Sequence, residues 1–185
     1  MIGEDVRVEY IDIMPMMDIL KFQMTRKTMS DNIRKRSIWD DFWSYPGSHP
    51  ENRLPLSDPY SSLLRRLRPG HGRNNIRILE VGCGSGFLTR SLVQEEYQRM
   101  ESAYLLDFSI VALKLAKTNE FRVPHKQSYI AADTLRLPFM DDFFDIVFTE
   151  GLNEHFDGAK RQSVFNEITR VCKNGGQIII IVPNS

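Results

Sequence analysis

IRILEVGCGSGF (residues 76–87) joins a short, mostly apolar and β-prone segment to a turn with three glycines and then to the start of a predicted helix. The segment predicts a buried strand at 76–81. Glycines at 82, 84 and 86 permit positive φ and let a ligand approach the backbone, while the N-terminus of the next helix favours an anionic group. Strand-to-helix turns also use glycine for structural reasons alone, so these residues predict a strand–turn–helix unit without identifying a ligand.

Segments of the same kind recur along the rest of the chain. Further strands are predicted at 103–107, 128–133, 143–149 and 176–182. Helices are predicted at about 87–100, 111–119 and 158–173, the second of them capped by Ser109. Strands that are apolar on both faces and alternate with helices are typical of a parallel sheet covered on both sides. We therefore predict an α/β, Rossmann-like, doubly wound and mostly parallel sheet, in which ligands bind at the carboxyl ends of the strands.

Four segments carry a more specific signal when they are read together. E-x-G-C-G-x-G begins at Glu80, an acidic residue follows at Asp107, and two longer blocks are AADTLRLPFMDDFFDIVFTEGLNEHF (131–156) and EITRVCKNGGQIIIIVPN (167–184). In this order and spacing they resemble the motifs of the class I S-adenosylmethionine-dependent methyltransferases, with Asn174 where that family usually has proline. The resemblance covers roughly residues 58–185 and is strongest toward the ubiquinone-biosynthesis-like group that acts on small molecules.

The resemblance implies S-adenosylmethionine as cofactor. It places Asp107 against the ribose hydroxyls and Asp133, with the amide of Thr134, against the adenine, and a carboxylate with two acceptor oxygens suits a diol. Glu80 would hold the glycine loop and attract the ammonium, and Glu150 would either line the methyl side or cap the next turn. The full set of implied cofactor contacts is Glu80, Gly82, Cys83, Gly84, Gly86, Asp107, Phe108, Asp133, Thr134, Glu150 and Gly151.

His155 is the candidate catalytic residue, because it follows the strand predicted at 143–149 on the methyl side. A base there would take a proton from the acceptor, whereas the alternative is a structural histidine packed beside the cofactor. The remaining histidines lack partners at metal-ligand spacing, so no metal site is predicted. Cys83 is interpreted as a small packing residue of the loop, since nothing near it in sequence would activate a thiol.

The function expected from the resemblance is in-line transfer of a methyl group to a small-molecule acceptor. Two alternatives come from other classes of protein. A non-catalytic, methyltransferase-like subunit would bind a partner instead of turning over substrate. A dinucleotide-dependent oxidoreductase would need glycine at position 87, where this chain has phenylalanine.

Composition excludes several other classes. Lys+Arg and Asp+Glu number 24 each, so the chain is not a uniformly basic nucleic-acid binder. The longest aliphatic run, 178–182, is far short of the roughly 20 residues of a membrane helix. Two cysteines cannot form a disulfide framework, and a reducing cytoplasm is the expected location.

Residues 1–57 are predicted to be an N-terminal helical and aromatic extension of the methyltransferase domain at 58–185. Its stretch from Lys21 to Arg36 carries six basic residues and one acid, which favours a solvated helix face over a grip for an acidic substrate or RNA. The aromatic cluster Trp39, Phe42, Trp43 and Tyr45 would either line the acceptor pocket, as part of a lid, or dock the extension onto the sheet.

The chain ends soon after the strand predicted at 176–182, whereas the family's sheet continues with two more strands, six and seven. That apolar strand is therefore expected to be an uncovered edge, which is an aggregation hazard. Three explanations remain open. The chain is a fragment, or a partner chain or second copy completes the sheet, or the N-terminal extension covers the edge.

Overall fold

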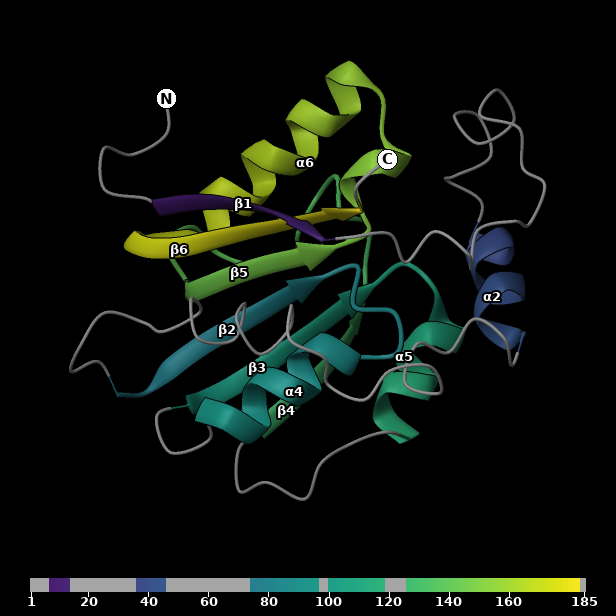
Figure 1. The fold of residues 1–185 in the computed structure, drawn as a ribbon, viewed down its shortest axis with the longest axis horizontal. Helices are drawn as coiled ribbons and strands as arrows, with labels where there is room; N and C mark the ends of the chain where they lie inside the picture. Colours follow the sequence, from purple (N-terminus) through teal and green to yellow (C-terminus); the bar gives the residue numbers. More distant parts are fainter. Residues whose placement is uncertain (1–6, 14–35, 46–73, 97–99, 119–125, 184–185) are drawn as a thin grey trace.

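The computed structural model describes residues 7–13, 36–45, 74–96, 100–118 and 126–183. Its centre is a six-stranded sheet whose neighbouring strands all pair in parallel, in the order β1-β6-β5-β2-β3-β4 (Figure 1). The strands are β1 (Arg7–Ile13), β2 (Ile76–Val81), β3 (Met100–Asp107), β4 (Lys126–Ala131), β5 (Phe144–Glu150) and β6 (Cys172–Pro183). The predicted Rossmann-like, doubly wound architecture is confirmed.

Helices cover both faces of the sheet. They are α2 (Arg36–Ser44), α4 (Phe87–Glu96), α5 (Ile110–Thr118) and α6 (Gly158–Val171), together with the short 3₁₀ helix η4 (Asn153–His155). Figure 1 shows α6 on the opposite side of the sheet from α4. The predicted cap of α5 is confirmed, because Ser109 Oγ accepts a hydrogen bond from the backbone N–H of Ala112 at 3.1 Å.

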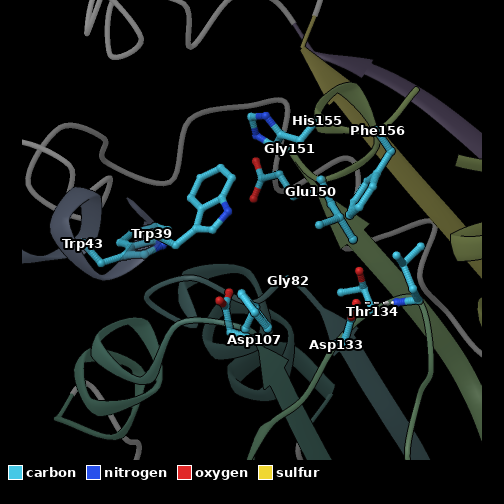
Figure 2. Close-up of a pocket in the computed structure, with 13 residues that line it drawn as sticks. Trp39, Trp43, Gly82, Asp107, Asp133, Thr134, Glu150, Gly151, His155 and Phe156 are labelled. Atoms are coloured by element: carbon cyan, nitrogen blue, oxygen red, sulfur yellow. Dashed lines mark hydrogen bonds between the residues drawn. The ribbon is translucent and has the colours of Figure 1, made fainter. Parts of the chain in front are cut away.

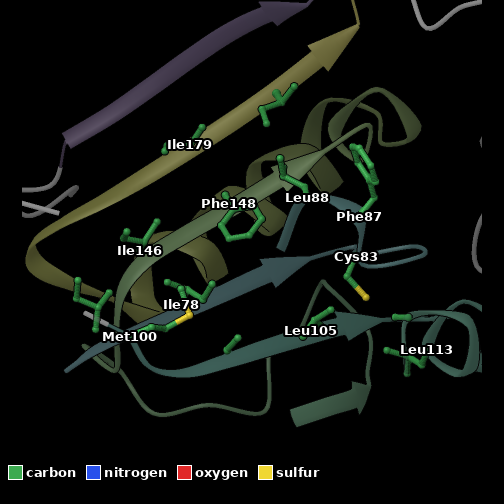
Figure 3. Close-up of a cluster of buried hydrophobic side chains, with 14 residues drawn as sticks. Ile78, Cys83, Phe87, Leu88, Met100, Leu105, Leu113, Ile146, Phe148 and Ile179 are labelled. Atoms are coloured by element: carbon green, nitrogen blue, oxygen red, sulfur yellow. The ribbon is translucent and has the colours of Figure 1, made fainter. Parts of the chain in front are cut away.

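Two hydrophobic clusters form the core, one on each face. Along β6, Ile179 and Ile181 pack into the cluster beneath α4 and α5, and Ile178 and Ile180 pack into the cluster beneath α6. Figure 3 shows the first cluster, in which Phe148 of β5 is fully buried. Alternate residues of a strand point to opposite faces, so a nearly continuous apolar run is what a doubly covered parallel strand requires.

The strand order creates a crevice beside β2. From β2 the chain runs outward through β3 to β4, and then returns to β5 on the other side of β2. The loops that follow β2 and β5 therefore leave the sheet in different directions, which opens a binding crevice at the carboxyl ends of these strands. The glycine turn after β2 and Glu150 at the end of β5 meet there.

The N-terminal strand β1 was not predicted. It pairs with β6 from Arg7–Gln177 to Ile13–Pro183, so the expectation that the last strand is an uncovered edge is wrong over these residues. Of the three explanations, the structure realises the covering of this edge by the N-terminal extension, and the edge is not available there to a partner chain or second copy. The extension also contains the helix α2, whereas the domain boundary at 57/58 and most of the basic stretch lie outside the described residues.

None of the helices in the described part of the chain has the length and apolar character to span a membrane.

Gly86 is the glycine of the turn where an added side chain would press against the hydrophobic core beneath α4 and α5. Its φ is +73°, and a Cβ atom would lie 2.9 Å from Leu105 Cδ2 and 3.1 Å from Ala116 Cβ, both in the core. We expect Gly86→Ala to lower the free energy of unfolding by about 1–3 kcal/mol. The matched control is Gly158→Ala, because nothing lies within 4 Å of a Cβ at that helical position. Urea unfolding of both variants checks this, and equal stabilities would contradict it.

Candidate functional site

A pocket opens at the carboxyl ends of the strands, at the crevice beside β2 (Figure 2). Its empty space is about 720 Å³ when the open solvent at its mouth is included. Its lining consists of Trp39, Trp43, Gly82, Asp107, Phe108, Asp133, Thr134, Leu135, Glu150, Gly151, Leu152, His155 and Phe156.

Asp107 ends β3 and is held rigidly at the pocket. Its Oδ2 accepts the N–H of Gly84 at 2.9 Å and its Oδ1 accepts the N–H of Ser109 at 2.8 Å. Only 8% of the residue is exposed, and this burial raises the pKa of its carboxyl despite those hydrogen bonds. Each carboxylate oxygen has a further lone pair, so both remain able to accept a hydrogen bond from a ligand.

Asp133 follows β4 and is exposed at the rim of the pocket. Its Oδ1 accepts the N–H of Leu135 at 2.9 Å, which forms a turn that fixes the direction of the carboxylate. Thr134 beside it is buried. The structure therefore brings Asp107, Asp133 and Thr134 together on one side of the pocket, as the resemblance implied.

Glu80 lies at the end of β2, where it binds α4. It does not line the pocket, and its carboxylate instead accepts hydrogen bonds from the N–H and the hydroxyl of Thr89 in the first turn of α4, the former at 3.1 Å. Burial is the main reason that the pKa of Glu80 rises to about 8, and the nearby Glu150 and Asp107 carboxylates raise it further. Glu80 joins the end of β2 to α4, and through them it supports the glycine turn.

The remaining loop residues lie beneath the pocket surface. Cys83, Gly84 and Gly86 are buried and are not among the lining residues, whereas Gly82 is. Gly84 is covered by Trp43, whose indole occupies the space that a Cβ atom on this glycine would take. Burial raises the pKa of the Cys83 thiol well above its ordinary value, which agrees with a packing role.

Glu150, Gly151 and His155 form the opposite side of the pocket. Gly151 has a φ of +62°, and its N–H donates to the carbonyl of Ile181 at 3.1 Å, which ties this loop to β6. His155 lies on η4, with its ring 4.8 Å from that of Trp39 in an edge contact. Burial lowers the pKa of His155 to about 4, so the imidazole is neutral at pH 7.

Helix α2 lies at one side of the pocket, which Trp39 and Trp43 line, and is fixed to the start of α5. Asp40 Oδ1 accepts the hydroxyl of Ser109 at 2.6 Å and the N–H of Val111 at 3.3 Å. Arg36 Nε donates to the carbonyl of Phe108 at 2.8 Å, and its guanidinium lies over the Phe108 ring, 5.0 Å from the centroid. A carboxylate at a helix N-terminus interacts favourably with the helix dipole. Asp40 and Arg36 thus dock the extension onto α5, and the aromatic cluster contributes Trp39 and Trp43 to the pocket.

Sequence reasoning missed three apolar lining residues, Leu135, Leu152 and Phe156. They lie within the quoted block 131–156, next to predicted site residues, and adjacency of this kind was the available signal. Among the residues that the structure describes, no group of three or more histidines, cysteines or acids is arranged to hold a metal ion.

A parallel, doubly wound sheet with a glycine turn and carboxylates at its switch point defines the chain as an α/β domain with a ligand crevice at the carboxyl ends of its strands. The methyltransferase domain family matches residues 79–180, and this chain belongs to that family. The predicted family is therefore confirmed, and the dinucleotide-dependent alternative is not supported.

Two known methyltransferases are similar in sequence to this chain. Tocopherol O-methyltransferase, chloroplastic, from Arabidopsis thaliana is 31% identical over 165 residues, which are 78% of this chain and 45% of that protein. The tRNA N(3)-cytidine methyltransferase METTL2 of Gallus gallus is 31% identical over 108 residues, 56% of this chain and 29% of that protein. The chain thus spans less than half the length of either relative.

A solved structure shares the fold. It is phosphoethanolamine N-methyltransferase 1 of Haemonchus contortus, in complex with phosphoethanolamine and S-adenosylhomocysteine. The TM-score is 0.61 at 17% identity, and the match covers 83% of this chain and 32% of that one.

Proposed function

We propose that this chain binds S-adenosylmethionine and transfers its methyl group to a small-molecule acceptor. The observation that carries the proposal is the rigid Asp107 carboxylate at the switch-point crevice, opposite Glu150 and beside Asp133. When bound, the cofactor would supply an electrophilic methyl group and a good leaving group. A solved neighbour that holds S-adenosylhomocysteine is consistent with this choice of ligand.

The residues present fit that cofactor. Asp107 would accept hydrogen bonds from the ribose diol, and Asp133 with Thr134 would hold the adenine. Gly82, with φ of +74°, lets the ligand lie against the backbone. On the far side, Glu150, Gly151 and His155 would face the methionine part and the acceptor.

The protein's part in the reaction is positioning and exclusion of water. Methyl transfer needs the nucleophile in line with the breaking bond, and alignment of this kind supplies most of the rate that such an enzyme must provide. Neutral His155 accepts a proton or hydrogen bond from the nucleophile, or else packs against Trp39 to shape the cavity. An acceptor other than a polynucleotide is favoured, because no lysine or arginine is among the described residues that line this pocket.

The test is calorimetric titration with S-adenosylmethionine and S-adenosylhomocysteine, with NAD as the control ligand. We expect micromolar binding of the first two and none of NAD. A folded chain that binds neither would contradict the proposal and favour a non-catalytic, methyltransferase-like subunit.

We also propose that α2 acts as a lid, in agreement with the expectation for the N-terminal extension. Trp43 covers Gly84, so cofactor that contacts this part of the loop has to displace the helix. Asp40→Ala removes the acceptor for Ser109 and Val111 and should release the lid. Stopped-flow measurement should then show S-adenosylhomocysteine binding and leaving roughly threefold to tenfold faster, as expected for the loss of charge-assisted hydrogen bonds.

The neighbouring Asp41 supplies the control for this prediction, because it is exposed on the same helix. Asp41→Ala should leave both rates unchanged. Equal rates in the Asp40 and Asp41 variants would contradict the lid.

A further inference from the structure

The pocket has two sides that differ in chemistry (Figure 2). Asp107, Asp133 and Thr134 lie on one side, at the ends of β3 and β4. Trp39, Glu150 and His155 lie on the other, on α2, β5 and η4. The first side suits the nucleoside, as proposed above, so the second side faces the space left for the acceptor. The inference that follows rests on that proposed function.

The charged side chains that line this pocket, among the described residues, are all acidic. Its described lining includes the three carboxylates of Asp107, Asp133 and Glu150 but no lysine or arginine. The only other titratable group of the lining is His155, and burial lowers its pKa to about 4, so it adds no positive charge at pH 7. A concave site lined by charges of one sign attracts ligands of the opposite sign. Acceptors that carry phosphate or carboxylate groups are disfavoured here.

Two aromatic rings lie beside the carboxylate of the second side, those of Trp39 and His155. Figure 2 shows the Glu150 carboxylate directed into the space between the Trp39 indole and the strand end, with His155 beside them. The rings of Trp39 and His155 meet edge to face, with centroids 4.8 Å apart and planes at 69°. This contact fixes the orientation of the indole next to the carboxylate. An indole face together with a carboxylate is the combination that recognises organic ammonium groups.

We propose that the acceptor is an organic cation, an amine or quaternary ammonium compound, whose charged group is held by Glu150 and Trp39. The charged group is an anchor, and the transferred methyl goes to a nucleophile elsewhere on the same molecule. Glu150 and Trp39 are specificity-determining residues in this arrangement.

The experiment uses a pair of probes with the same shape but different charge. Choline and its uncharged analogue 3,3-dimethylbutan-1-ol are titrated into the chain saturated with S-adenosylhomocysteine. We expect choline to bind at least about tenfold more tightly than the alcohol. The ratio should fall toward one in Glu150→Gln and decrease in Trp39→Leu. Glu101→Gln is the matched control, since this residue lies on the exposed part of β3 and pairs with Arg77.

Three results would overturn the inference. One is equal binding of the two probes by the unaltered chain, and another is a ratio that survives in both variants. The third is selectivity for choline that disappears once S-adenosylhomocysteine is bound, because Glu150 would then serve the cofactor's ammonium. Failure of S-adenosylhomocysteine to bind would instead contradict the proposed function, and the same two probes applied to the unliganded chain would still decide whether the cation site exists.

Discussion

Replacing Asp107 by alanine is expected to weaken the binding of S-adenosylhomocysteine at least tenfold. The variant lacks the carboxylate that would accept two charge-assisted hydrogen bonds from the ribose. Such bonds are roughly twice as strong as neutral ones. The residue is well placed for this role because Gly84 and Ser109 already hold both of its oxygens in fixed positions. Calorimetric titration measures the effect.

The same hydrogen bonds make Asp107 important for folding, so the experiment needs a second variant. Alanine leaves the buried N–H groups of Gly84 and Ser109 without their acceptor, at a cost of about 1–3 kcal/mol each. Asp107→Asn keeps the size of the side chain and one carbonyl oxygen, and it should lose less stability while still binding more weakly than the unaltered chain.

Asp157→Ala supplies the control for both variants of Asp107. This aspartate precedes α6, makes no side-chain cap hydrogen bond and does not line the pocket. Circular dichroism establishes which variants are folded at the temperature of the titration. A folded Asp107 variant with unchanged affinity would contradict the assignment of this residue.

Those parts of the site that depend on local sequence and on the general geometry of parallel sheets could be predicted. Asp107, Asp133 and Glu150 each follow an apolar strand, and the carboxyl ends of parallel strands meet at one edge of the sheet. Ser109 was recognisable as a cap because it stands directly before a helical stretch. These inferences need no knowledge of which distant residues touch.

Contacts between segments that are far apart in the chain could not be predicted from the sequence. RVEYIDI (7–13) contains the β-prone residues of a strand, but nothing in it specifies parallel pairing with β6, whose partner residues lie 170 positions away. In the same way, alternation along β2 places Glu80 on the sheet face that α4 covers. It does not predict that Thr89 is the hydrogen-bond partner of Glu80. The position of Trp43 over Gly84 depends on how α2 docks on α5.

Together these contacts join the extension to the side of the pocket formed by Asp107. Asp40 binds Ser109, whose N–H binds Asp107, and Asp107 in turn binds the N–H of Gly84 beneath Trp43. The lid and the glycine turn therefore share one network of hydrogen bonds and packing. Binding of a ligand at Asp107 and movement of α2 are therefore expected to be coupled.

In the unaltered protein, Glu80 is expected to make the free energy of unfolding decrease as the pH rises. Glu80→Gln is expected to abolish this decrease. Burial raises the pKa of Glu80 to about 8 in the folded chain, against an ordinary value of 4.5. Between these values the folded chain keeps a proton that the unfolded chain has released. Stability therefore falls as pH increases through this range and levels off above the folded pKa.

The clearest window is pH 6.5 to 8. Below it His155 contributes in the opposite direction, because its pKa is lowered to about 4 and its stabilising effect is lost only as the pH falls below 6.5. Above pH 6.5 the imidazole is neutral in the folded chain and mostly neutral in the unfolded chain. Over this interval Glu80 lowers the free energy of unfolding by about 2 kcal/mol, since each pH unit corresponds to about 1.4 kcal/mol for one proton.

Glutamine can still accept the hydrogen bonds from Thr89 through its amide oxygen, so the variant tests the charge and not the contact. Urea unfolding at several pH values should give a free energy of unfolding that decreases by about 2 kcal/mol less than in the unaltered chain. Glu101→Gln, exposed on β3, should keep the slope of the unaltered chain. If Glu80→Gln keeps that slope as well, Glu80 is ionised in the folded protein at neutral pH, and its carboxylate supports α4 as an anion.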